Sequence, residues 1–316
     1  MFASKPAIIA LALGLGALPA ARAYDLPQVN LGATSFVDSP PMTPPPWVLQ
    51  QYLQYYTSDK LADDRGHSLP FPPTQSSDVL ISMTQLTYTS PLRLGNSTLG
   101  FNAVLPAILS NSTDDGLDGS FIRGRNGMGD ITFGPVFWFD PIMGPQGPRF
   151  SHRIELDAIA PTGAYDSKNS INPGSNAWAF DPYWSATFWA TPRWSMSLRL
   201  HYLWSGRNDD PPASLGPGAH SLQGGQAVHA NFATEYQFFD TLAFGVAGYW
   251  LKQTTDSKIN GDEVSGRREK VTALGPGALW RPTRTDMFYF NAYHEFDVEN
   301  RPQGSRFVVR YMKLFD

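Results

Sequence analysis

The amino-acid sequence predicts an all-β protein, a transmembrane antiparallel β-barrel of about 12 strands, with roughly 10 to 14 compatible with the pattern. Three observations lead to this fold class. Alternating apolar and polar residues recur in segments of about 10–14 residues from Trp47 onward. Long and short connections follow one another strictly, and aromatic residues gather at the ends of the segments. We therefore expect long external loops, short periplasmic turns and lipid around the outer wall.

The clearest of these segments is 194–204. Its apolar face has Trp194 at one end, Tyr202 and Trp204 at the other, and methionine and leucine between them. The opposite face is mostly polar and includes Arg199 and His201. Aromatic residues that flank an aliphatic band are typical of the two bilayer interfaces, whereas a soluble β-sandwich gives no reason for them.

The remaining segments divide the chain from 47 to 316 in the same way. Candidate strands begin near Trp47, Asp78, Thr98, Asp130, Arg149, Trp178, Trp194, Gln226, Leu242, Lys270, Met287 and Arg306. Long polar connections occupy 58–77, 110–126, 162–177, 206–225, 255–268 and, shorter, 299–304. Short turns occupy 91–95, 140–148, 191–193, 239–241 and 281–286. An even number of strands returns both ends of the barrel to the periplasm.

The residues before the barrel have the three parts of a secretory signal peptide. Lys5 lies in a short positive region, 7–18 is apolar, and 21–23 is a small-x-small cleavage site. The expected domains are a signal peptide at 1–23, a proline-rich segment at 24–46 and the barrel at 47–316. The proline-rich segment has five prolines between Pro40 and Pro46, too many for a strand. It is expected either to plug the lumen or to hang as a periplasmic tail.

Composition excludes several classes of protein. Cysteine is absent, so we expect no disulfide, thiolate nucleophile or zinc–thiolate site. The formal net charge is −4, and the basic residues are scattered, which argues against a nucleic-acid partner. No run reaches the length of a membrane-spanning helix. Aromatic residues make up 13% of the chain and charged residues only 16%, whereas an ordinary soluble domain is about 25% charged.

Two local features bear on how the wall is built. Glycine precedes proline within strands at Gly134-Pro135 and Gly275-Pro276, which predicts a bulge or kink that either bends the closed wall or opens a lateral gap. The final strand places Phe307, Val309, Tyr311 and Phe315 at alternate positions, a pattern that resembles the signal read by the outer-membrane assembly machinery. Lys313 departs from that pattern, and we expect it to snorkel to the interface.

The polar faces of the strands predict the residues that line the lumen. The pore-lining candidates are Arg153, Glu155, Asp157, Arg199, His201, His229, Asn231, Glu235, Glu295, Arg306 and Arg310, and Asp297 shares their phase. They carry both signs of charge, whereas a wide pore selective for one charge would show a ring of one sign. We therefore expect a narrow, partly plugged lumen. His201 and His229 lie on neighbouring strands and could approach each other, but no metal-ligand spacing occurs.

An enzymatic barrel is a less favoured alternative to a channel. Outer-membrane phospholipases carry a compact His-x-Ser-Asn-Gly element, and neither His152-Arg153 nor His220-Ser221 continues into Asn-Gly. Asp209-Asp210, a candidate for an omptin-type acidic pair, precedes two prolines and is better explained as a loop turn. We expect no catalytic residue, no cofactor and no metal.

Three motifs in order resemble the SphA-like outer-membrane proteins, a family associated with the MetA pathway of phenol degradation. They are the segments 127–130, 161–166 and 172–178. The residues that carry the resemblance, expected to be structural, are Gly127, Gly129, Asp130, Pro161, Thr162, Gly163, Tyr165, Asn176 and Trp178. The resemblance implies a channel in the bacterial outer membrane for passive uptake of small hydrophobic or aromatic compounds.

The expected partners follow from that location. They are outer-membrane lipid and lipopolysaccharide, the assembly machinery and a small hydrophobic or aromatic solute, reached after export through the cleaved signal peptide. A structural or adhesive barrel that acts through its external loops remains an alternative, and a barrel hydrolase is a further one.

Overall fold

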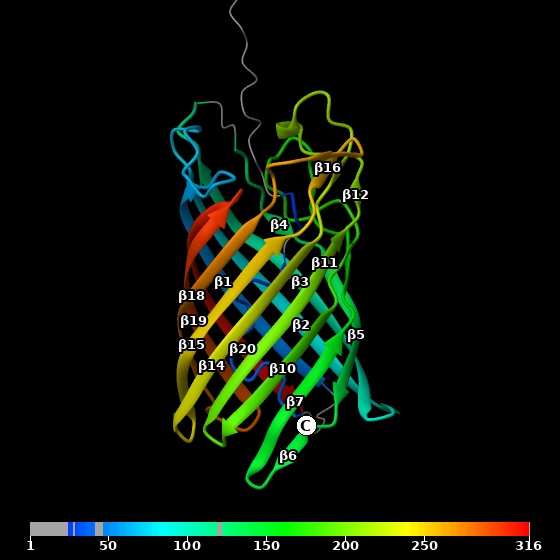
Figure 1. Ribbon diagram of the computed structural model, residues 1–316, viewed down its shortest axis with the longest axis vertical. Coiled ribbons are helices and arrows are strands. Elements are labelled where there is room, and N and C mark those ends of the chain that lie inside the picture. Colours follow the sequence, from blue (N-terminus) through cyan, green and yellow to red (C-terminus); the bar gives the residue numbers. More distant parts are fainter. Residues whose placement is uncertain (1–24, 28, 42–46, 119–121, 316) are drawn as a thin grey trace, which may run out of the picture.

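The computed structural model describes residues 25–27, 29–41, 47–118 and 122–315. Its main antiparallel sheet closes on itself, because β20 (Pro302–Phe315) pairs with β1 (Trp47–Leu61) from one end of the barrel to the other (Figure 1). The register joins Trp47 to Phe315 at one rim and Leu61 to Pro302 at the opposite rim. The predicted all-β barrel is therefore confirmed. The expected signal peptide lies outside the described residues.

Twelve strand positions form the wall in the described residues, as the alternating pattern predicts. In order they are β1, β2 (Ser76–Leu94), β3 (Ser97–Asp114), β5 (Ile131–Phe139), β7 (Gly147–Glu155) continued by β8 (Ala158–Ala160), β9 (Ala179–Phe180) continued by β10 (Tyr183–Thr191), β11 (Trp194–Ser205), β14 (Ala227–Phe239), β15 (Leu242–Gln253), β18 (Lys270–Trp280), β19 (Asp286–Glu299) and β20. No helix in the described part of the chain has the length and hydropathy needed to span a bilayer.

The shorter elements lie next to the wall or in the loops at the long-loop end. β4 (Gly127–Met128) pairs with β3, and β6 (Ile142–Gly144) pairs with β7. A separate small sheet joins β12 (Arg207–Asn208), β13 (Leu222–Gln223), β16 (Ser257–Ile259) and β17 (Asp262–Val264), and η1 (Ala213–Leu215) is a short 3₁₀ turn. The long loops gather at the upper rim in Figure 1, and the C-terminus lies at the opposite rim with the short turns.

Side chains alternate between an exposed apolar face and a buried polar face. In β11 every second residue is exposed from Trp194 to Trp204, and every intervening residue is buried. Large apolar side chains are exposed around the wall, among them Leu53, Leu86, Phe101, Leu105, Phe133, Phe188, Met196, Leu198, Leu200, Phe244, Val246, Phe290, Phe307 and Val309. An exposed apolar belt of this extent requires hydrocarbon around it, which is the arrangement of a transmembrane barrel.

The Gly134-Pro135 step of β5 coincides with breaks in the next two strand positions, between β7 and β8 and between β9 and β10. β5 pairs with β7 on one side of the step and with β8 on the other. Gly134 is required there, because a Cβ would lie 2.2 Å from the backbone oxygen of Leu156. The Leu156 amide donates to the Pro135 oxygen at 3.1 Å, and the Asp181 amide donates to the Asp157 oxygen at 2.8 Å. These bonds bridge the breaks, so a bend in a closed wall describes them better than a gap.

Several sequence boundaries differ from the structure. β1 extends to Leu61, whereas the long connection was expected to begin at 58. The last connection is only the two residues Asn300 and Arg301, because β20 begins at Pro302. Asp297 was expected to face the lumen, and this prediction is wrong. Its φ of 53° reverses the alternation beside a register shift, so Asp297 is exposed and forms an ion pair with Lys270.

Lys313 also differs from its expectation. Its Nζ atom lies 2.9 Å from a carboxylate oxygen of Asp286 and donates to Thr285 at 3.0 Å. Tyr311 donates to the same aspartate at 2.6 Å. The lysine is therefore held by an ion pair across the β19–β20 hairpin instead of reaching freely to the interface.

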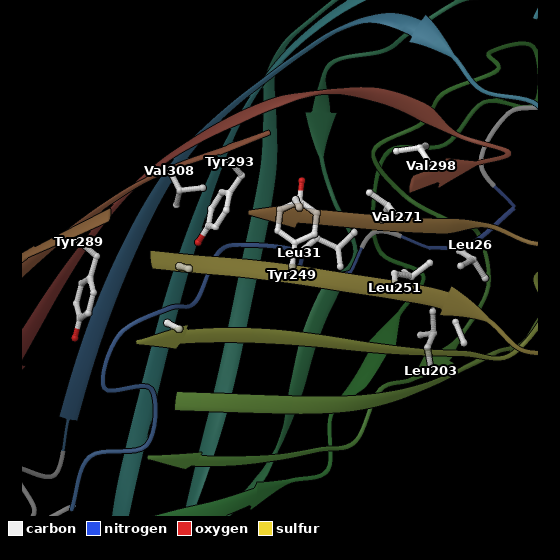
Figure 2. Close-up of a cluster of buried hydrophobic side chains, with 14 of the residues drawn as sticks. Leu26, Leu31, Leu203, Tyr249, Leu251, Val271, Tyr289, Tyr293, Val298 and Val308 are labelled. Atoms are coloured by element: carbon white, nitrogen blue, oxygen red, sulfur yellow. The ribbon is translucent and has the colours of Figure 1, made fainter. Parts of the chain in front are cut away.

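The interior is partly packed with apolar side chains. Leu26, Leu31 and Phe36 precede the barrel in sequence and belong to one buried cluster with Tyr249 and Tyr293. Figure 2 shows Leu31 beside Tyr249, and Tyr289 and Tyr293 pointing inward from β19. The segment 25–41 thus contributes to the packing inside the barrel.

Candidate functional site

The candidate site is the lumen, where the predicted pore-lining residues all face inward. Ten of them are buried, at 8% exposure or less: Glu155, Asp157, Arg199, His201, His229, Asn231, Glu235, Glu295, Arg306 and Arg310. Arg153 is half-buried, with 11% of its side chain exposed. Charges of both signs therefore lie in the interior, where each needs a partner.

Asp38 of the segment 25–41 supplies one such partner near the middle of the lumen. Arg199 donates from Nε and Nη2 to its two carboxylate oxygens, at 2.7 Å each. Ser185 donates to the same carboxylate at 2.7 Å, and Arg153 donates to the backbone oxygen of Asp38. Only 3% of the Asp38 side chain and 7% of the Arg199 side chain are exposed. A buried ion pair with two parallel hydrogen bonds holds its partners in a defined geometry.

The neighbouring residues of the segment bind other strands. The Gly32 amide donates to Asn231 of β14 at 2.7 Å, and Asn231 donates to the Asn30 backbone at 3.0 Å. Ser35 donates to Asn291 of β19 at 2.9 Å. The amide of Ser39 donates to Thr187 of β10 at 3.0 Å. Polar residues of several wall strands thus satisfy the segment's backbone, which has no strand partner of its own.

A second ion pair holds the beginning of the segment at the long-loop end. Arg267 donates from Nε to Asp25 at 2.8 Å and also from Nη2. Glu269, in the loop before β18, accepts the backbone amides of Asp25 and Leu26 at 3.1 and 3.3 Å. Burial raises the pKa of Glu269 to about 7, although Arg301 at 3.4 Å acts in the opposite direction.

The raised pKa of Glu269 predicts a pH-dependent stability. Because the folded-state value lies above the ordinary value of 4.5, this group favours folding most below pH 4.5, and that contribution is lost as pH rises through 7. We expect wild-type stability to fall by up to about 3 kcal/mol between pH 4.5 and 8 through this group. Glu269→Gln should lack that slope, as measured by urea unfolding in detergent at both pH values. Equal slopes in the two proteins would contradict the assignment, since Asp25, Arg267 and Arg301 are unchanged.

His201 and His229 come together, but not as a metal site. Their rings stack with centroids 4.1 Å apart and planes 16° apart. His201 Nδ1 and His229 Nε2 each lie 3.1 Å from a different carboxylate oxygen of Asp181. The three ligand atoms are within 4.8 Å of one another, but one ion cannot lie in the planes of two nearly parallel rings. The geometry fits one carboxylate bridging two imidazoles.

The family-motif residues meet at one point on the long-loop rim. Asp130 accepts the Gly163 amide at 2.8 Å and both the amide and the hydroxyl of Ser175 at 2.7 Å. Gly163 cannot carry a side chain, because a Cβ would lie 2.7 Å from the backbone of Gly129 and of Gly174. One carboxylate and three closely packed glycines therefore fasten the three motif segments together.

The other motif residues extend this junction. Thr162 accepts the Ile131 amide at 3.0 Å, and Tyr165 donates to the Asp210 backbone oxygen at 2.6 Å. Asn176 donates to Asn208 of β12 at 2.8 Å. The remaining motif residues are Gly127, at a φ of 145°, the half-buried Pro161 and the exposed Trp178. Most of the motif residues thus form hydrogen bonds that connect one loop to another loop or to a strand.

Sequence reasoning missed three kinds of lumen residue. Asp38 lies in a segment without strand periodicity, and Asp181 lies in a break between β9 and β10. The inward-facing tyrosines of β1 and β19 are not among the pore-lining candidates. A signal was available for them, since Tyr52 and Tyr56 have the same four-residue spacing as Arg306 and Arg310.

Comparison with known protein families shows to which family the chain belongs. The sequence profile of the family described as "Putative MetA-pathway of phenol degradation" matches residues 58–311. The chain belongs to this family. The resemblance inferred from the motifs is confirmed, and the match to the phenol-degradation family extends from β1 into β20. A comparison with curated proteins finds no match.

A solved outer-membrane channel shares the fold of this phenol-degradation family member. The COG4313 outer membrane channel from Pseudomonas putida F1 superimposes with a TM-score of 0.74 at 19% identity, and the match covers 91% of this chain and 100% of that chain. The TodX deltaS2S3 mutant monoaromatic hydrocarbon channel has a TM-score of 0.44 at 10% identity, covering 86% of this chain and 91% of that one. The NanC porin has a TM-score of 0.41 at 10% identity, covering 84% and 99%. Likeness at the level of the last two supports no inference about solutes.

Proposed function

We propose that this protein is a bacterial outer-membrane channel for the passive uptake of small hydrophobic or aromatic compounds. Membership of the phenol-degradation family over residues 58–311 is the observation that carries the proposal. A closed barrel with an apolar outer belt supplies the path, and its tyrosine-rich interior supplies surfaces on which an aromatic ring can stack. No enzymatic step is part of the proposal.

The segment 25–41 acts in this proposal as a plug. The ion pairs of Asp25 and Asp38 fix it at the long-loop end and in the middle of the lumen. A lumen occupied in this way excludes large hydrophilic solutes while leaving tyrosine faces for small apolar ones. Residues 42–46 of the proline-rich segment lie outside the described residues.

The same proposal places the exposed apolar belt against outer-membrane lipid and lipopolysaccharide. Trp194 and Trp204, at opposite ends of β11, would lie at the two interfaces. The alternate aromatic residues of β20, which ends at Phe315, would serve as the signal for the assembly machinery. Export through a cleaved signal peptide at 1–23 completes this location.

A deletion strain tests the proposed function directly. We expect slower uptake of radiolabelled phenol at low external concentration, because apolar solutes cross the lipopolysaccharide leaflet poorly, and restoration by the complete gene. Glucose uptake in the same cells is the control for general envelope damage. Unchanged uptake across a panel of phenol, toluene and alkylphenols would overturn the proposed function.

A further inference from the structure

Two inward-facing arginines of β20 lie between inward-facing tyrosines of both neighbouring strands. The register places Arg310 opposite Tyr52 of β1 and Tyr289 of β19. Four residues earlier, Arg306 is opposite Tyr56 and Tyr293 in the same way. We name these two triplets the Arg310 rung and the Arg306 rung. At about 3.4 Å per residue they lie roughly 14 Å apart along the strand.

Tyrosine rings contact the faces of both guanidinium groups. The Arg310 Cζ atom is 3.6 Å from the Tyr289 ring centroid and 5.9 Å from that of Tyr52. The Arg306 Cζ atom is 5.0 Å from the Tyr56 ring centroid and 5.3 Å from that of Tyr249. Stacking of this kind is favourable for a cation but leaves the N–H groups at the edge of the guanidinium without acceptors.

Two of the three nitrogen atoms of the Arg310 guanidinium have no acceptor among the described residues. Its Nε and Nη2 atoms are buried and form no hydrogen bond there, and only 2% of the residue is exposed. Arg306 Nε is in the same condition. Neither arginine has a carboxylate within ion-pair distance in the described part of the chain. A buried cation in this condition is costly unless an anion approaches it.

Two other buried arginines show which chemical group binds to a guanidinium through Nε and Nη2. Arg199 uses Nε and Nη2 to bind the Asp38 carboxylate, and Arg267 uses the same two atoms to bind Asp25. Arg310 therefore presents, beside two tyrosine rings, the pair of donors that two other lumen arginines apply to a carboxylate. The planar fork of a guanidinium matches a carboxylate with two parallel bonds.

We propose that the Arg310 rung binds aromatic carboxylates of the benzoate class, with Arg310 on the carboxylate and the tyrosines on the ring. The proposal rests on the proposed channel function and names a charged class of its solutes. A phenol is a weaker candidate for this rung, because its pKa near 10 leaves it neutral at pH 7. The Arg306 rung lies nearer the long-loop end. A solute that enters from outside would reach it first, and we expect it to bind the solute more weakly.

The two rungs differ because Glu295 lies beside the Arg306 rung. Tyr56 and Tyr249 donate to its two carboxylate oxygens at 2.8 and 2.7 Å, and the Gly304 amide donates at 3.0 Å. A negative charge there weakens the attraction for a second anion. Two sites of unequal, moderate affinity in series allow a solute to enter and also to leave.

Calorimetric titration of the purified barrel in detergent with benzoate, acetate and phenol tests the inference. Wild type should bind benzoate at least about 10-fold more tightly than acetate, because acetate has no ring to stack. Arg310→Gln should weaken benzoate binding by about 10- to 100-fold, and Arg310→Lys by less, since lysine keeps the charge but loses the fork. Arg207→Gln, at an exposed loop arginine, is the matched control and should bind as wild type does.

The outcomes separate this inference from the proposed function. No benzoate binding to wild type, or equal binding by wild type and Arg310→Gln, would overturn the inference. Equal binding of acetate and benzoate would also overturn it, because the tyrosines would then contribute nothing. Heat-modifiable gel mobility confirms that each variant is folded. Phenol uptake by the deletion strain carrying Arg207→Gln should match wild type, and loss of phenol uptake in the deletion strain itself decides the channel function separately.

Discussion

Replacing Asp38 by asparagine is expected to loosen the part of the segment 25–41 around Asp38 and to raise the ion conductance of single barrels in planar bilayers. The substitution removes the charge that Arg199 binds with two hydrogen bonds and leaves Arg199 buried without a carboxylate. Breaking a buried pair in this way costs about 3–5 kcal/mol. The residues around Asp38 then keep only neutral hydrogen bonds, such as those of Ser35 and Ser39, whereas the Asp25–Arg267 ion pair still holds the beginning of the segment.

Cysteine labelling gives an independent readout of the same prediction. The chain has no cysteine, so Thr34→Cys introduces a single thiol at a site that is 2% exposed. It should react slowly with a bulky maleimide in the otherwise wild-type protein and quickly in the Asp38→Asn background. Asp209→Asn, at an exposed loop aspartate paired with Arg207, is the control and should change neither conductance nor labelling. Wild-type conductance and slow labelling in Asp38→Asn would refute the plug.

Replacing Asp130 by alanine is expected to lower the free energy of unfolding on the order of 4 kcal/mol, because three donors lose a charged acceptor. Those donors are the Gly163 amide and the amide and hydroxyl of Ser175. Asp130→Asn keeps one acceptor oxygen and should lose about half as much. Urea unfolding of the detergent-solubilised barrel measures both variants.

The control for Asp130 is Asp118→Ala, an exposed aspartate of another loop at the same rim, which should change stability by less than about 0.5 kcal/mol. Limited proteolysis should also show earlier cleavage within 161–178 in Asp130→Ala, because the junction of the motif loops is weakened. A variant as stable and as resistant as the control would show that the close glycine packing alone fastens these loops.

The wall was predictable from the sequence because its cause is local. A strand between lipid and a polar lumen must alternate residue by residue, and the segment from Trp194 to Trp204 does so except at Leu203 on its inner face. The predicted alternation of inward- and outward-facing residues fails at Asp297, where the backbone departs from extended geometry with a positive φ. Strand ends were less predictable, because β1 continues to Leu61 through backbone pairing with β20 and through side-chain hydrogen bonds such as that from Lys60 to Gln303.

The sequence predicts which residue types line the lumen. It does not predict which of them bind to one another. Alternation indicated which charged residues face inward, and their burial agrees with that. Alternation cannot indicate that Asp38 would meet Arg199, because the two are 161 positions apart and Asp38 lies outside any strand. The stacking of His201 on His229 required the exact register of β11 and β14, which the sequence leaves open by one or two residues.

The contacts of the segment 25–41 also set an order of events in folding. Its hydrogen bonds to the wall and the outer loops join residues that are 115 to 256 positions apart in the chain, up to the link between Ser35 and Asn291. Such non-local contacts form slowly, since the loop-closure entropy must be lost before any of them is gained. The segment 25–41 therefore finds its place late, after strands β7 to β19 have assembled. Although it is made before the strands that hold it, it is in this sense among the last parts to fold.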